Sequence, residues 1–153
     1  MTIYSQAFSE GGEIPVDYTC DGQGKSPALT FGNVPDGSKS LTLILEDPDA
    51  PQGTFTHWLV FNIPPDTVTV DEELPTTTPT FGLPGRNSAG SESYVGPCPP
   101  NGQHRYYFTL YALDTTLPLE AGTTKEQVMA AMVGHVIAET RLMGCYGAER
   151  RKI

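Results

Sequence analysis

Residues 41–51 read LTLILEDPDAP, a short apolar run followed by acidic residues and prolines. The apolar part, 41–45, is too short for a typical helix and is closely followed by Pro48, so we predict a buried β-strand. Two later segments have the same character, WLVFNI at 58–63 and the aromatic-rich YYFTLYAL at 106–113. These segments predict a domain built mainly from β-sheet.

Weaker strand patterns surround these three segments. We expect shorter strands at 3–8, 28–31, 67–70 and, at the C-terminal end, 139–146. Between residues 64 and 100 the chain changes character, because eight of its fourteen prolines fall there. Proline cannot donate to a strand ladder, so this stretch is predicted to be a long irregular excursion and not a central strand.

One helix is predicted late in the chain. Thr123 and Glu126 have the spacing of a capping box, which marks a helix N-terminus. Gly134 lies within the segment that follows, and His135 is assigned to packing or to the surface. The apolar positions recur at helical spacing, and we interpret them as a core face: Val128, Met129, Met132, Val133, Val136 and Ile137.

Length and charge restrict the class of protein. A chain of 153 residues fits one domain spanning 1–153. The formal net charge is −9, and the only dense basic run is 150–152, which is typical of a solvated chain end. Nucleic-acid binding requires clustered Lys and Arg, so we do not expect a nucleic-acid partner.

The lack of a recognisable targeting signal and the pattern of cysteines lead us to expect a cytoplasmic protein. No apolar stretch approaches the ~20 residues of a membrane span, and residues 1–15 lack the features of a secretory signal. Cys20, Cys98 and Cys145 are odd in number and form no C-x-x-C pair, which fits reduced thiols in a cytoplasm. One disulfide plus a free thiol is the alternative. Cys98, between prolines, is expected to be buried and unreactive.

Polar side chains occur where the three predicted strands begin or end. Asp47 closes the first strand, His57 precedes the second, and His104 and Tyr106 begin the third on one face of the sheet. If the strands are neighbours, these groups converge and suit a small anion, because imidazoles and a phenol can donate hydrogen bonds. Arg105 faces the other way and is expected in a structural salt bridge. The DPDAP stretch alone is also compatible with a simple Asx turn.

Two motifs in order resemble a known family. DPDAP followed by His57, and then YVGPCPPNGQHRYYF at 94–108, resemble the phosphatidylethanolamine-binding protein family, in particular its bacterial and archaeal Raf-kinase-inhibitor-like branch. The segments YTCDG at 18–22 and 135–146 support the resemblance, which covers nearly the whole chain. The resemblance implies two packed antiparallel sheets with a C-terminal helix.

The resemblance also implies a pocket for small anions or phosphorylated head groups. His57 and His104 would donate to the anion, Tyr106 would add a hydroxyl, and Asp47 would orient and charge an imidazole. Carried over by motif, the lining is Asp47, Asp49, His57, Gly96, Cys98, Pro100, His104 and Tyr106. We expect no cofactor and no catalysis.

Three functions follow from these residues. The first is a regulatory protein that binds a phosphorylated or anionic ligand and modulates a kinase or protease, with a homodimer compatible with two-sheet packing. The second is a hydrolase, although no G-x-S-x-G motif is present and Ser88, Ser91 and Ser93 lie in a polar loop. The third is a metal site formed by His57, His104 and a carboxylate.

Overall fold

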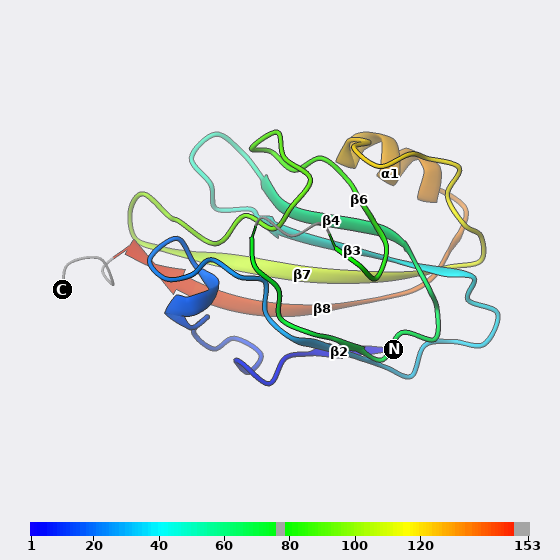
Figure 1. The fold of residues 1–153 in the computed structure, drawn as a ribbon, viewed down its shortest axis with the longest axis horizontal. Helices are drawn as coiled ribbons and strands as arrows, with labels where there is room; N and C mark the ends of the chain where they lie inside the picture. The colour runs from blue at the N-terminus through cyan, green and yellow to red at the C-terminus, as the bar shows by residue number, and fades with distance from the viewer. Residues whose placement is uncertain (76–78, 149–153) are drawn as a thin grey trace.

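The computed structural model describes residues 1–75 and 79–148, so the basic run 150–152 lies outside the described residues. Two antiparallel sheets make up the domain (Figure 1). The larger sheet has the strand order β6-β4-β3-β7-β8. Its strands are β3 (Ser40–Asp47), β4 (Phe55–Ile63), β6 (Leu83–Pro84), β7 (Gln103–Leu113) and β8 (Val136–Gly147).

The smaller sheet has the order β1-β2-β5. It consists of β1 (Thr2–Tyr4), β2 (Leu29–Gly32) and β5 (Thr69–Val70), and a short 3-10 turn, Val16–Tyr18, lies between its first two strands in the chain. The helix α1 (Lys125–Met132) precedes β8. The prediction of a mainly β protein, with two packed antiparallel sheets and one helix near the C-terminus, is confirmed.

The predicted strands differ from the observed ones chiefly at their ends. Each of the seven predicted segments overlaps an observed strand. The two-residue strand β6 was not predicted, because Pro84 cannot donate to a ladder. It is accommodated because β6 lies at the edge of the larger sheet, where Pro84 pairs with Val60 of β4.

The core is divided between the two faces of β3. Leu41, Leu43 and Leu45 point into the layer between the sheets, where they pack with side chains of the smaller sheet such as Phe31. Ile44 points the other way, into a second apolar cluster beneath α1. Since successive side chains of a strand alternate between faces, a strand that is apolar at both sets of positions is covered on both sides.

The helix prediction was wrong in two respects. The N-cap is Thr124, one residue later than predicted, and its capping box uses Gln127 in place of Glu126. The helix also ends at Met132, because Gly134 adopts a left-handed conformation (φ 83°) just after the C-cap. Of the predicted core face, only Val128 and Met132 are buried, and Val133 is 77% exposed.

Gly134 therefore separates a helix from a strand. The last two positions of the predicted apolar face, Val136 and Ile137, belong to β8, and both are exposed. His135 lies at the surface, as one of the two predicted options, and its ring pairs with Asp114 at 2.7 Å.

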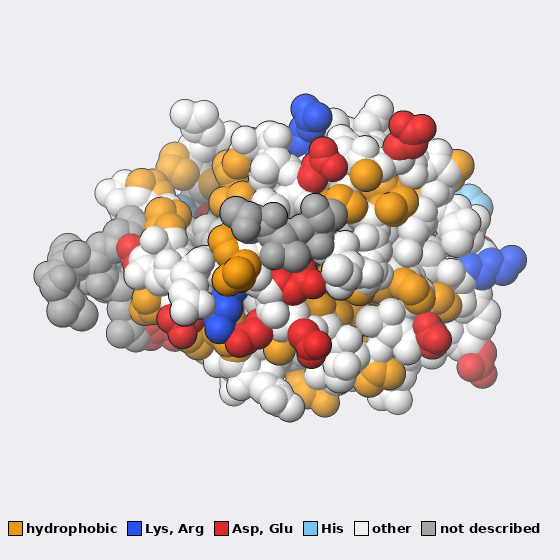
Figure 2. All heavy atoms as spheres, viewed as in Figure 1, with side chains coloured by type: hydrophobic (Ala, Val, Ile, Leu, Met, Phe, Trp, Pro, Cys, Tyr) orange, Lys and Arg blue, Asp and Glu red, His pale blue; other side chains and the backbone are white. Residues whose placement is uncertain are grey.

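The surface is acidic without a basic patch on the face shown in Figure 2, where Lys and Arg side chains are scattered among acidic ones. The chain carries nine basic and eighteen acidic residues. In the part of the chain that the structure describes, we find no helix with the length and apolar character needed to cross a membrane.

Truncating the centre of the core tests this architecture. Leu43→Ala should lower the free energy of unfolding by about 2–5 kcal/mol, because it removes a fully buried side chain between the sheets. Val133→Ala is the matched control and should change it by less than about 0.5 kcal/mol, because Val133 is exposed. Urea denaturation measures both, and equal effects would contradict the assignment of the core.

Candidate functional site

The site lies where three neighbouring strands of the larger sheet meet. β3 pairs with both β4 and β7, and both pairings are antiparallel. The end of β3 therefore lies beside the starts of the other two strands, with Asp47 opposite Phe55 of β4 and Glu46 opposite Tyr107 of β7. This pairing brings Asp47, His57, His104 and Tyr106 to one end of the sheet.

A cavity of about 180 Å³ opens at this end. Seven of the eight predicted site residues line it, and Asp49 does not. The four polar side chains that the strands contribute are buried, from 0% exposed for Tyr106 to 8% for His104. The lining consists of Asp47, Ala50, Pro51, Phe55, His57, Val95, Gly96, Cys98, Pro99, Pro100, His104 and Tyr106.

Asp49 faces away from the cavity and holds Arg105. Its carboxylate accepts hydrogen bonds from Arg105 Nε at 2.9 Å, from Nη2 at 2.7 Å and from the backbone N–H of the same residue. The hydrogen bonds from Arg105 lower the pKa of Asp49 to about 2. The structural salt bridge predicted for Arg105 is present, and it fixes the DPDAP loop to the start of β7.

Asp47 combines the turn role and the site role that the sequence left as alternatives. Its Oδ1 accepts the backbone N–H of Asp49 at 2.8 Å, which is an Asx turn. Its Oδ2 lies 2.6 Å from Nδ1 of His104. Because an ionised carboxylate only accepts, Nδ1 carries the proton, and Nε2 of His104 is left for a ligand.

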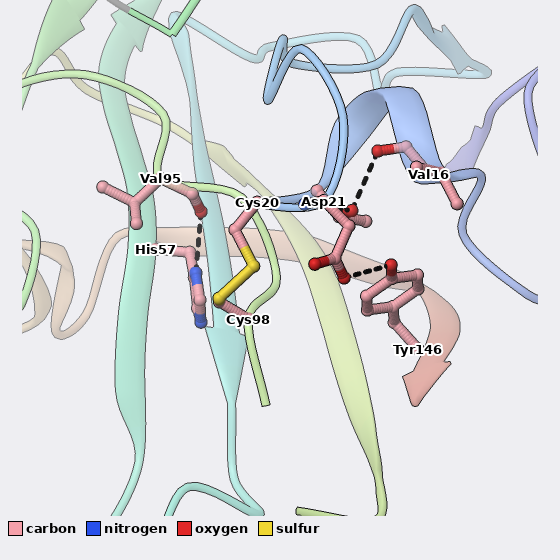
Figure 3. Close-up of a disulfide and its surroundings, with 8 residues drawn as sticks. Val16, Cys20, Asp21, His57, Val95, Cys98 and Tyr146 are labelled. Carbon is pink, nitrogen blue, oxygen red and sulfur yellow. Dashed lines mark hydrogen bonds between the residues drawn. A yellow bond between two sulfur atoms is a disulfide. The ribbon is translucent and has the colours of Figure 1, made fainter. Parts of the chain in front are cut away.

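The ring of His57 is also held through its Nδ1, here by a backbone carbonyl of the proline-rich loop. Its Nδ1 lies 2.7 Å from the carbonyl oxygen of Val95, as Figure 3 shows. A carbonyl only accepts, so Nδ1 is the donor and Nε2 of the neutral ring is an acceptor. Burial lowers the pKa of His57, although the Val95 carbonyl and Asp47 oppose this shift.

Aromatic contacts surround the two imidazoles. The ring of His57 lies 4.7 Å from that of Phe55 and 5.4 Å, edge to face, from that of Tyr106. The rings of His104 and Tyr106 are stacked with centroids 6.4 Å apart. Tyr106 thus forms the floor between the two histidines, and neither imidazole can rotate freely.

The loop that contains Gly96, Cys98, Pro99 and Pro100 forms one wall of the cavity, and a disulfide joins its Cys98 to Cys20 (Figure 3). The expectation of three reduced thiols is therefore wrong, and so is that of a buried Cys98, since both bonded cysteines are exposed. Cys145 is the free thiol among the described residues. The alternative of one disulfide plus one free thiol is the one observed, but residues 78 positions apart give no local signal of pairing.

Other contacts hold the same two loops together. Cys20 donates its backbone N–H to the Pro97 carbonyl at 3.2 Å, and the hydroxyl of Tyr94 donates to the Tyr18 carbonyl at 2.7 Å. Glycine is required at position 96, because a Cβ there would lie 2.9 Å from the Tyr18 carbonyl oxygen. Since prolines 97, 99 and 100 have no N–H to donate, the disulfide is a main attachment of this wall.

Comparison with known proteins identifies the family of the chain. The family model described as phosphatidylethanolamine-binding protein matches residues 4–147. The chain belongs to this family. A protein from Methanothermobacter thermautotrophicus, named UPF0098 protein, is 50% identical over 148 residues, covering 95% of this chain and 98% of its own. A Chlamydia trachomatis UPF0098 protein is 48% identical, with the same coverage.

Two solved structures have the same fold. A crystal structure described as a phosphatidylethanolamine-binding protein homologue from Chlamydia trachomatis superposes with a TM-score of 0.88 at 48% identity, covering 94% of this chain and 95% of that one. YbcL of E. coli, described as a new member of the mammalian family, gives a TM-score of 0.86 at 30% identity, covering 95% and 97%.

Within this family fold, sequence reasoning missed five residues that line the cavity. Phe55 could have been found, because it precedes His57 by two positions and residues two apart on a strand share a face. The predicted strand began at 58, three residues after the observed start of β4. The others belong to loops, whose path depends on tertiary contacts. The missed residues are Ala50, Pro51, Phe55, Val95 and Pro99.

The predicted alternative of a metal centre needs at least three ligands. Across 1–75 and 79–148, we find no group of three or more His, Cys, Asp or Glu side chains arranged to hold a metal ion. Both Asp47 oxygens are already engaged by the Asx turn and by His104.

Removal of the disulfide should destabilise the protein. Replacing Cys20 and Cys98 together by Ser should lower the free energy of unfolding by about 2–5 kcal/mol, because a long loop is no longer closed in the unfolded chain. Reducing the wild type with a dithiol should have the same effect. Denaturant unfolding measures both.

Cys145→Ser is the control, since this thiol is free, and it should alter stability by less than about 0.5 kcal/mol. A double variant as stable as the wild type would show that the two loops are held without the covalent bond.

Proposed function

We propose that this protein binds a small anionic or phosphorylated ligand in the cavity at the ends of β3, β4 and β7, and that it acts as a regulatory ligand-binding protein. The observation that carries the proposal is the pair of buried imidazoles that line one cavity, each with its Nδ1 held by a partner inside the protein. Nε2 is therefore the ring nitrogen of each histidine that can form a hydrogen bond with a ligand. Membership of the phosphatidylethanolamine-binding protein family supports a ligand-binding role in general.

The tautomers imply that anion binding is coupled to proton uptake. In the neutral rings, Nε2 is an acceptor and repels an anionic oxygen. Protonation converts it into a charged donor, and hydrogen bonds between ionised groups are the stronger kind. The ligand can also supply the proton, as a monoprotonated phosphate does. Because burial lowers the pKa of His57, that ring is neutral at neutral pH unless an anion is bound.

The loop serines favour binding over hydrolysis. Ser88 accepts the backbone N–H of Thr56 at 2.8 Å, and Ser91 accepts from the side chain of Asn87 at 2.8 Å. Neither of them, nor Ser93, is among the residues that line the cavity. These contacts give the serines a role in loop structure, so a nucleophile for a hydrolase would have to come from elsewhere.

The protein partner and the oligomeric state are further parts of the proposed function. A kinase or protease as the regulated protein is a prediction, as is a homodimer. A cytoplasmic location also stays a prediction, and the Cys20–Cys98 disulfide removes one of its arguments, because disulfides are commoner in oxidising compartments.

The proposal predicts that His104→Ala weakens phosphate binding by about 10- to 100-fold. The variant removes a charge-assisted hydrogen bond, which is typically worth about 1.5–3 kcal/mol. Calorimetric titration with inorganic phosphate and phosphoethanolamine measures the loss. His135→Ala is the control, because its imidazole is exposed and pairs with Asp114 outside the cavity.

The same titration should depend on pH. Affinity of the wild type should be higher at mildly acidic pH and fall as the pH rises, because burial lowers the pKa of His57 and its imidazole loses the proton that makes Nε2 a donor. Equal binding by wild type and His104→Ala, or binding by neither, would refute the anion pocket.

A further inference from the structure

Apart from the groups that would hold the anion, the cavity has an apolar wall. The polar side chains Asp47, His57, His104 and Tyr106 come from the strand ends. The rest of the lining comes from loops and from the start of β4, and it offers no charged side chain. It is made of Ala50, Pro51, Phe55, Val95, Gly96, Cys98, Pro99 and Pro100.

Phe55 lies directly beside one of the proposed anion-binding groups. Its ring centroid is 4.7 Å from that of His57, with the planes inclined by 58°. Phe55 is only partly buried, so part of its surface remains open to a ligand. A substituent attached to an acid group held at His57 would therefore contact this ring and the nearby loop.

A cationic substituent would find no free carboxylate here. Asp47 is the one carboxylate among the described residues of the lining, and both of its oxygens are engaged. Asp49, the nearest alternative in the chain, is ion-paired with Arg105 outside the cavity. An ammonium would find as partners only aromatic rings and a carboxylate already shared with His104, so the wall is better suited to a neutral substituent.

The size of the cavity suits an acid with a compact substituent. An apolar cavity of about 150 Å³ can hold benzene, and this one has about 180 Å³, so a ring together with its acid group would fill it and extend past its opening. Ala50, Pro51 and Phe55 also border a second hollow of about 470 Å³, which extends along the loop to Ser88. A bare phosphate would leave the apolar wall in contact with water.

We propose that the ligand is a small organic acid whose phosphate or carboxylate group carries a neutral, apolar substituent of about the size of a ring. This inference rests on the proposed anion-binding function and specifies the ligand class. Phe55 is the residue that would select the substituent, and His57 and His104 would hold the acid group.

Four probes distinguish the contribution of the acid group to affinity from that of its substituent. They are inorganic phosphate, ethyl phosphate, phosphoethanolamine and phenyl phosphate. Each is titrated by calorimetry into the disulfide-bonded protein at mildly acidic pH. Phenyl phosphate should bind roughly 10- to 100-fold more tightly than inorganic phosphate, as expected for burying one ring. Phosphoethanolamine should bind no more tightly than ethyl phosphate, which differs from it by lacking the ammonium group.

Variants of Phe55 test the wall. Phe55→Ala should remove most of the advantage of phenyl phosphate over inorganic phosphate. The test compares the ratio of the two affinities, because loss of the ring that packs on His57 also changes the affinity for phosphate itself. Phe55→Leu keeps an apolar side chain and should retain part of the advantage, which guards against a folding defect in the alanine variant. Tyr4→Ala is the matched control, because Tyr4 is an exposed aromatic residue on β1, outside the cavity.

The outcomes distinguish the two proposals. If none of the probes binds, the anion-binding function fails, and the ligand class fails with it. If the probes bind and His104→Ala weakens them, but phenyl phosphate is no tighter than phosphate, the ligand class alone is wrong. It is also wrong if phosphoethanolamine binds more tightly than ethyl phosphate.

Discussion

The central strand of the larger sheet, β3, is covered on both faces and paired on both edges. Its leucines pack between the sheets, Ile44 packs beneath α1, and its backbone pairs with β4 and β7. A shift of one residue in either pairing would turn every side chain of a strand to the other face, which the two-sided core does not permit. The register that places Asp47 beside the histidines is therefore imposed by packing.

The polar end of the cavity is rigid because its groups already have partners within the protein. Asp47 uses one oxygen for its own turn and the other for His104, and His57 is fixed by a carbonyl from the proline-rich loop. Each imidazole is thereby held in a defined tautomer. The proposed ligand would meet two Nε2 atoms whose charge depends on protonation, and this arrangement is set by hydrogen bonds on the far side of each ring.

The apolar part of the cavity lining comes mostly from loops, whereas its polar side chains come from the ends of β3, β4 and β7. It is formed by loops that are distant in the chain and are joined by the Cys20–Cys98 disulfide and by the close approach of Gly96 to the Tyr18–Thr19 backbone. Family membership accounts for the two packed sheets. The apolar side chains between the motif residues, Phe55 above all, distinguish which anion the cavity would accept.

The sequence alone was sufficient for seven of the eight described strands, the mainly β fold and the four polar side chains at the strand ends, because apolar runs and prolines are local signals. It was not sufficient for the end of the helix, where the apolar spacing continues past Gly134 although the backbone turns there. Asp49 was placed in the cavity by its motif, but its carboxylate turns outward to Arg105. The disulfide and the missed wall residues depend on which loops meet in space, and only the tertiary structure decides that.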